Sequence, residues 1–117
     1  MDGHDQRTCV QRTARVAELN DRLRRSGAGG KIVLTKAVAA RGPQFVAALI
    51  NAVQQFDDFT PANDLHREHD FGSVTVAGET FFWKIDVYDF NLELGSPDPT
   101  NETISRRVLT LMSPSDL

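Results

Sequence analysis

The sequence contains a single cysteine, Cys9, so no disulfide bond can form within the chain. A lone free thiol is typical of proteins that work in a reducing compartment. No apolar run approaches the ~20 residues that a membrane-spanning helix needs, and residues 1–12 lack the apolar stretch of a secretory signal. These absences lead us to expect a cytoplasmic location.

Recognisable catalytic signatures are missing as well. The glycine-rich segment 26–30 does not have the spacing of a phosphate-binding loop, and it precedes a predicted strand instead of opening a helix. No arrangement of Ser, His and an acid stands out. Cys9 is disfavoured as a nucleophile, because an isolated cysteine usually acts as a small packing residue. The sequence therefore favours a protein that is not an enzyme, and we predict no cofactor.

The two signs of charge are concentrated in different parts of the chain. Residues 1–31 carry seven basic and four acidic residues, whereas residues 57–102 carry two basic and eleven acidic residues. Blocks of opposite charge attract each other and keep a protein soluble. The acidic region also fits a basic partner. It disfavours nucleic-acid binding by this part of the chain, because phosphate binding needs basic residues.

Hydrophobic spacing predicts two helices and a strand. In residues 5–25 a narrow apolar stripe recurs among arginines, and residues 26–30 end this helix with glycines that suit a left-handed cap. Residues 31–35 form a short β-branched run that predicts a buried strand, and residues 36–40 predict a brief helical turn. The broadest apolar face follows Pro43, which suits a first helical turn. We expect this second helix to be the main core helix.

A β-hairpin is predicted around a two-residue turn at Ala77-Gly78. The predicted partners are Val76 with Glu79, Val74 with Phe81, and Gly72 with Trp83. In this register Gly72 leaves room for the indole of Trp83. A last strand is expected within residues 104–112, although this segment also fits a helix.

The order of these elements predicts an α+β fold. We expect a small, mostly antiparallel sheet packed against one main helix, with an N-terminal helix attached by the glycine-rich hinge. The predicted units are residues 1–30, the N-terminal helix and hinge, and residues 31–117, the α+β core domain.

One face of the predicted hairpin is apolar and points to the core helix, while the other carries aromatic and charged side chains. Exposed aromatics among charges are typical of binding centres. The predicted partner-binding residues are Phe82, Lys84, Asp86, Tyr88, Asp89 and Glu93. The alternative is that the outward aromatics form a second core layer under the N-terminal helix.

Histidines and carboxylates suggest a second kind of site. His66 and His69 lie three residues apart beside carboxylates, a pattern that fits a divalent metal, although a solvated loop has the same composition. His69 with Asp70, Asp86 and Asp98 also fits an acid–base or metal site. The competing interpretation pairs Asp86 with Lys84 across strands and uses Asp98 to hold a turn. We predict no metal.

The arginines of the N-terminal helix have two interpretations. Phosphate contact is one of them, and the residues concerned are Arg12, Arg15, Arg22 and Arg25. The favoured interpretation is a solvated basic face that is attracted to the acidic middle of the same chain. We therefore regard direct nucleic-acid binding as disfavoured.

Five segments occur in a specific order within residues 32–112. They are IVLT, FDDFTPANDLHREHDFG, FFWKIDVYD, GSPDP and RRVLTLM. Together they resemble a family of small bacterial proteins classed as a domain of unknown function, DUF3768. The family pattern has Asp-Gly at the hairpin turn, where this chain has Ala77-Gly78. The resemblance implies a cytoplasmic accessory protein carried by plasmids, phages and other mobile elements, chiefly in proteobacteria, and it brings no catalytic residues.

We therefore expect a non-enzymatic protein-binding accessory factor that presents an acidic face to a basic partner. A nucleic-acid-handling host defence complex is such a partner, so an anti-CRISPR or anti-restriction inhibitor is the most concrete form of this hypothesis. The alternative is a small metal- or carboxylate-dependent enzyme. A homodimer is left open.

Overall fold

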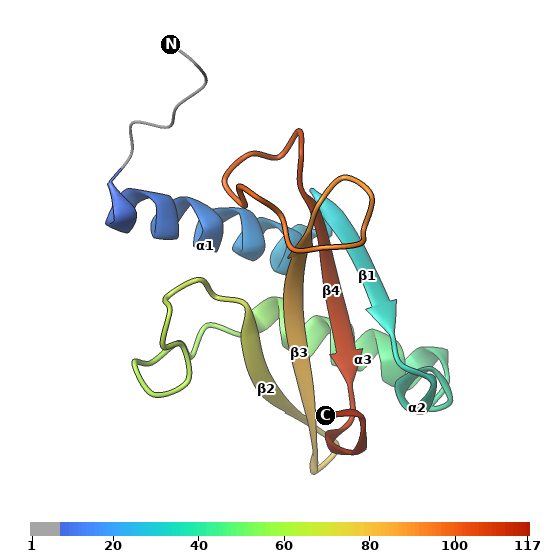
Figure 1. Ribbon diagram of the computed structural model, residues 1–117. Coiled ribbons are helices and arrows are strands. Elements are labelled where there is room, and N and C mark those ends of the chain that lie inside the picture. Colours follow the sequence, from blue (N-terminus) through green and yellow to red (C-terminus); the bar gives the residue numbers. More distant parts are fainter. Residues whose placement is uncertain (1–7) are drawn as a thin grey trace.

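The computed structural model describes residues 8–117 as a four-stranded sheet with helices (Figure 1). The elements are α1 (Cys9–Ser26), β1 (Gly30–Leu34), α2 (Lys36–Ala39), α3 (Pro43–Gln55), β2 (Phe71–Val76), β3 (Glu79–Tyr88), β4 (Arg106–Met112) and a 3-10 turn, η1 (Pro114–Asp116). The strand order is β1-β4-β3-β2, with β1 parallel to β4 and the other neighbouring pairs antiparallel. The predicted α+β fold with a mostly antiparallel sheet is confirmed. No helix within residues 8–117 is long and apolar enough to span a membrane.

Both long helices pack on the same side of the sheet, which we call the inner face (Figure 1). Leu23 of α1 and Leu49 of α3 are fully buried there, in the same hydrophobic cluster as Trp83 of β3. Full burial of one large apolar side chain contributes about 1.5–3 kcal/mol. The predicted core helix is therefore confirmed as α3, and α1 contributes to the same core. The predicted domain boundary after residue 30 stays a prediction.

Local signals define both ends of α1. The Gln11 N–H donates to Thr8 Oγ1 (3.1 Å) and the Thr8 N–H donates to Gln11 Oε1 (2.8 Å), which makes a capping box. The predicted left-handed cap is found at Gly27 (φ 77°), whose N–H donates to the Leu23 carbonyl at 2.8 Å. The predicted start of this helix at residue 5 lies outside the described residues.

The hairpin has the predicted register. The partners are Val76 and Glu79, Val74 and Phe81, and Gly72 and Trp83. Ala77 (φ 52°) and Gly78 (φ 79°) both have positive φ, as a type I′ turn requires. A Cβ at position 72 would lie 2.6 Å from the indole nitrogen of Trp83. Only glycine therefore fits opposite the indole, as predicted.

The other predicted boundaries hold with small shifts. The strand predicted at residues 31–35 is β1, the brief helical turn is α2, and Pro43 is the first residue of α3. For residues 104–112, the strand interpretation is correct. β4 lies between β1 and β3 and pairs with both, which makes it central to the sheet.

Neither of the two long helices covers the opposite side of the sheet, which we call the outer face (Figure 1). Side chains alternate along a strand, and the register places Phe71, Phe82, Lys84, Asp86, Tyr88, Arg106, Val108 and Thr110 on this face. Because α1 packs on the inner face, the alternative of a second core layer under the N-terminal helix is wrong.

Candidate functional site

The inner face encloses a cation, Arg24 of α1, whose side chain is 0% exposed. Its Nη1 donates to the carbonyls of Val53 (3.1 Å) and Phe56 (2.6 Å) at the C-terminal end of α3, and its Nη2 donates to Asp21 Oδ1 (3.0 Å). The guanidinium lies 5.4 Å from the ring centroid of Trp83. Burial lowers the pKa of Arg24 below its ordinary value, and Asp21 opposes that shift. Arg24 thus ties α1 to the carbonyls at the C-terminal end of α3, where a cation is favourable.

Asp21 also holds His69, which belongs to the loop before β2. The Nδ1 atom of His69 lies 3.0 Å and 3.1 Å from the two Asp21 oxygens, and its Nε2 lies 3.5 Å from Asp64 Oδ2. The imidazole stacks on Phe59, with ring centroids 3.8 Å apart and an interplanar angle of 4°. His69 has φ 54°, an uncommon conformation for a residue with a side chain. These contacts hold the loop against α1.

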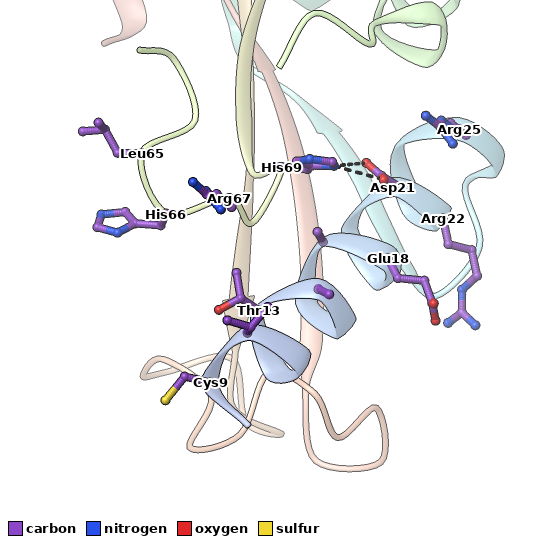
Figure 2. Close-up of a pocket in the computed structure, with 13 residues that line it drawn as sticks. Cys9, Thr13, Glu18, Asp21, Arg22, Arg25, Leu65, His66, Arg67 and His69 are labelled. Carbon is purple, nitrogen blue, oxygen red and sulfur yellow. Dashed lines mark hydrogen bonds and ion pairs between the residues drawn. The ribbon is translucent and has the colours of Figure 1, made fainter. Parts of the chain in front are cut away.

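A groove of about 870 Å³ lies between α1 and this loop (Figure 2). The pair of Asp21 and His69 closes one end of it, where the dashed contacts in Figure 2 join the loop to the helix. Cys9 and Val10 line the opposite end, and both are exposed. Leu65 on the loop side is 77% exposed. The groove therefore combines an apolar wall with one closed polar end.

Four of the predicted partner-binding residues lie together on the outer face. Phe82, Lys84, Asp86 and Tyr88 occupy alternate positions of β3. Phe82 stacks with Phe71 of β2 at a centroid distance of 5.7 Å and an angle of 21°. Lys84 Nζ lies 3.3 Å from Asp86 Oδ2. The predicted ion pair is thus present, but it runs along one strand and does not cross between strands as predicted.

The other two predicted residues, Asp89 and Glu93, belong to residues 89–95, which we call the apical loop. The Glu93 N–H donates to Asp89 Oδ1 (3.0 Å), and the Asp89 N–H donates to the Leu94 carbonyl (2.8 Å). The loop begins where β3 ends at Tyr88, and Tyr88 also forms a bridge with Gly95. The apical loop is therefore closed on itself and continues the outer face.

Sequence reasoning missed two apolar residues of the apical loop, Leu92 and Leu94. Phe90 is 61% exposed and Leu94 is 71% exposed, and Leu92 is exposed between them. The guanidinium of Arg106 covers one side of the Phe90 ring, 4.1 Å from its centroid. Apolar residues do not recur at a regular spacing in a turn. The only sequence signal for Leu92 and Leu94 was therefore that an irregular segment holds three large apolar residues.

The arginines of α1 face acidic residues of the same chain. Arg12 Nη2 lies 2.7 Å from Asp98 Oδ1. Glu102 pairs with Arg22 and also with Arg15. These contacts confirm the predicted attraction between the basic helix and the acidic middle of the chain.

The predicted acidic sheet face is not found on the sheet itself. On β3 and β4 the outer face carries two basic residues, Lys84 and Arg106, and one acidic residue, Asp86. The predicted charge of this face is wrong because most acidic residues of 57–102 lie in loops and not in the strands. Two acidic residues, Asp89 and Glu93, lie in the apical loop that follows β3.

The four residues of the predicted acid–base or metal site do not come together in one cluster. His69 lies in the groove, whereas Asp86 lies on the outer face. Asp98 accepts a hydrogen bond from the Thr100 hydroxyl, which lowers the pKa of Asp98, and it holds its turn as the competing interpretation expected. Within residues 8–117, no group of three His, Cys, Asp or Glu residues is placed to hold a metal ion. His66 lines the groove, but its ring points away from that of His69 (Figure 2).

The chain belongs to the family described as Protein of unknown function (DUF3768), whose model matches residues 34–116. The match begins at the end of β1 and runs through η1, so it includes the outer-face residues of β2, β3 and β4 and the apical loop. Comparison with curated proteins gave no match, and comparison with solved structures gave none either. α1 lies outside the matched residues although it supplies Arg24 to the core.

Proposed function

We propose that this member of the DUF3768 family is a non-enzymatic accessory factor that binds a protein partner through the apical loop and the adjoining outer face. The main support is the exposure of large apolar side chains in the apical loop, Phe90, Leu92 and Leu94. Single exposed apolar residues are normal on a protein surface, but a group of them marks an interaction site. Tyr88, which is partly exposed, adjoins this group at the end of β3.

The charges around this surface favour a partner with basic residues. Asp89 and Glu93 accompany the three apolar side chains in the same loop. A centre of aromatic and apolar residues with a charged rim is the usual anatomy of a protein interface. The rim would steer a basic partner, while the apolar centre would supply most of the affinity.

The finer proposal is a cytoplasmic factor from a mobile element that inhibits a nucleic-acid-handling host defence complex. The support for it is the mobile-element origin that the sequence resemblance implies, together with the excess of acidic residues in 57–102. Proteins that bind nucleic acid expose basic surfaces. An acidic loop with an apolar centre is complementary to such a surface.

The test is affinity capture of tagged protein from the lysate of a proteobacterial host at moderate salt, read by mass spectrometry. We expect one stoichiometric protein with the wild-type bait, and loss of that protein with the double variant Phe90→Ser and Leu94→Ser. The matched control is Leu65→Ser, which removes an equally exposed leucine from the groove. The same protein on all three baits, or no specific protein on the wild-type bait, would overturn the proposal.

A further inference from the structure

β2 is an edge strand of the sheet, and its pairing shows which of its backbone groups are free. The Ile85 N–H donates to the Asp70 carbonyl at 2.7 Å, and these two residues are directly opposite in the hairpin register. In an antiparallel pair, directly bonded positions alternate with unbonded ones. Every second residue along β2 therefore directs its N–H and C=O away from β3. These outward residues are Phe71, Ser73 and Thr75.

The outward groups have no other partner in the described part of the chain. The backbone hydrogen bonds formed outside helices and strands involve none of the three residues, and all three are exposed. An unpaired edge of this kind is a template for another strand, and proteins usually protect such edges with charges, proline or a bulge. The segment FGSVTV has no charged residue and no proline, and its pairing with β3 is unbroken. The opposite edge, β1, carries Lys31.

We propose that a second copy of this chain pairs with β2 in antiparallel orientation about a two-fold axis at Ser73. Ser73 then faces Ser73 of the other copy, and Phe71 faces Thr75 in both directions. Each outward residue exchanges a pair of backbone hydrogen bonds with its opposite residue, as antiparallel pairing requires. The two four-stranded sheets become one continuous sheet.

The sequence of β2 suits self-pairing for three reasons. A two-fold interface brings the same patch of both copies together, so the patch must be complementary to itself. Without charged residues in FGSVTV, no like charges meet across the axis. The small Ser73 at the centre permits close approach, while Phe71 packs beside Thr75, a favourable combination of an aromatic and a β-branched residue. This inference does not depend on the proposed function, because the apical loop lies outside β2.

The test combines sedimentation velocity with residue-resolved amide exchange at low and high protein concentration. We expect the sedimenting mass to double as concentration rises. The amides of Phe71, Ser73 and Thr75 should exchange at least tenfold more slowly in the dimer. The amides of Gly72 and Val74 already pair with β3, so they should be protected at both concentrations.

Variants of the edge make the test specific. Ser73→Lys places two like charges opposite each other at the axis and should leave only monomer, whereas Ser73→Thr should keep the dimer. Asn51→Lys adds the same charge to an exposed position of α3 and should also keep it. A wild-type protein that stays monomeric would overturn the proposal. It would do so even if β2 paired with a strand of a different protein. A dimer that survives Ser73→Lys would overturn it as well. The Phe90→Ser and Leu94→Ser variant should dimerise normally, which separates this result from the capture experiment.

Discussion

The inner and outer faces of the sheet are built from alternate residues of the same strands, yet they differ in almost every physical respect. On β3, Trp83 is fully buried, whereas its neighbour Lys84 is exposed. The inner face is covered by α1 and α3, and even its buried cation, Arg24, has several partners. The outer face has aromatic rings and charges that neither α1 nor α3 covers. The inner face is therefore specified by packing, while the outer face is free to be specified by a partner.

The largest expected effect on stability is at Arg24. Arg24→Met should lower the free energy of unfolding by about 3–5 kcal/mol, because it leaves Asp21 and the last carbonyls of α3 without their buried donor. Urea denaturation measures this change. The matched control is Arg25→Met, since Arg25 is the exposed neighbour and should change the free energy by less than about 0.5 kcal/mol. Equal effects at the two arginines would contradict the role given to Arg24.

A smaller loss is expected at Gly72. The Cβ of Gly72→Ala would meet the indole nitrogen of Trp83 at 2.6 Å and force one of them to move. Overpacking of this kind costs about 1–3 kcal/mol. Ser73→Ala, one residue along on the outward side, should be nearly neutral by the same denaturation assay. A tolerant Gly72→Ala protein would show that the inner face is less tightly packed than described.

Two carboxylates should respond to pH in opposite directions. Burial raises the pKa of Asp70, so its charged form destabilises the folded state above that pKa, and the cost disappears as pH falls toward the unfolded value of about 3.9. Asp70→Asn should therefore raise the free energy of unfolding at pH 7 and give no gain at pH 3.

Asp98 is the contrasting case. The hydrogen bond from Thr100 lowers the pKa of Asp98, so its contribution to stability is present above the unfolded pKa and is lost as pH falls through the folded pKa. Asp98→Asn should therefore lower stability at pH 7, and the loss should shrink in acid. Urea denaturation of Asp70→Asn and Asp98→Asn at pH 7 and pH 3 measures both changes in the free energy of unfolding. The same sign for both would contradict this account.

The smallest effect on stability is expected on the outer face. Lys84→Ala together with Asp86→Ala removes an exposed ion pair, and such pairs contribute about 0–1 kcal/mol. We expect the free energy of unfolding to change by less than about 0.5 kcal/mol, as judged by urea denaturation. A loss as large as that of Gly72→Ala would mean that this face serves folding and is not available for a partner.

The sequence predicted the hairpin correctly because two independent signals agreed. The turn at Ala77-Gly78 set the register, and the alternation of apolar residues set the face. The same reasoning could not find Arg24, since a helical pattern treats every arginine as part of the polar side. The burial of Arg24 depends on the position of Phe56, the residue after the end of α3, whose carbonyl accepts from Arg24 although the two segments are far apart in the chain.

Regular alternation along a strand also explains which part of the candidate site could be predicted from the sequence. Phe82, Lys84, Asp86 and Tyr88 share a face because strand alternation is regular. Leu92 and Leu94 belong to a turn, where exposure has no periodic signal. The sign of charge on the face was wrong because composition counts acidic residues without showing which of them lie in loops.

The most direct test of the central claim is to map the partner on the labelled protein. Amide chemical shifts would be recorded before and after addition of the protein recovered by affinity capture. The account predicts that the shifted amides gather in residues 89–95 and in the outer-face positions of β3, with little change at Cys9 and Leu65. Shifts that gather in the groove between α1 and the loop before β2 would contradict it.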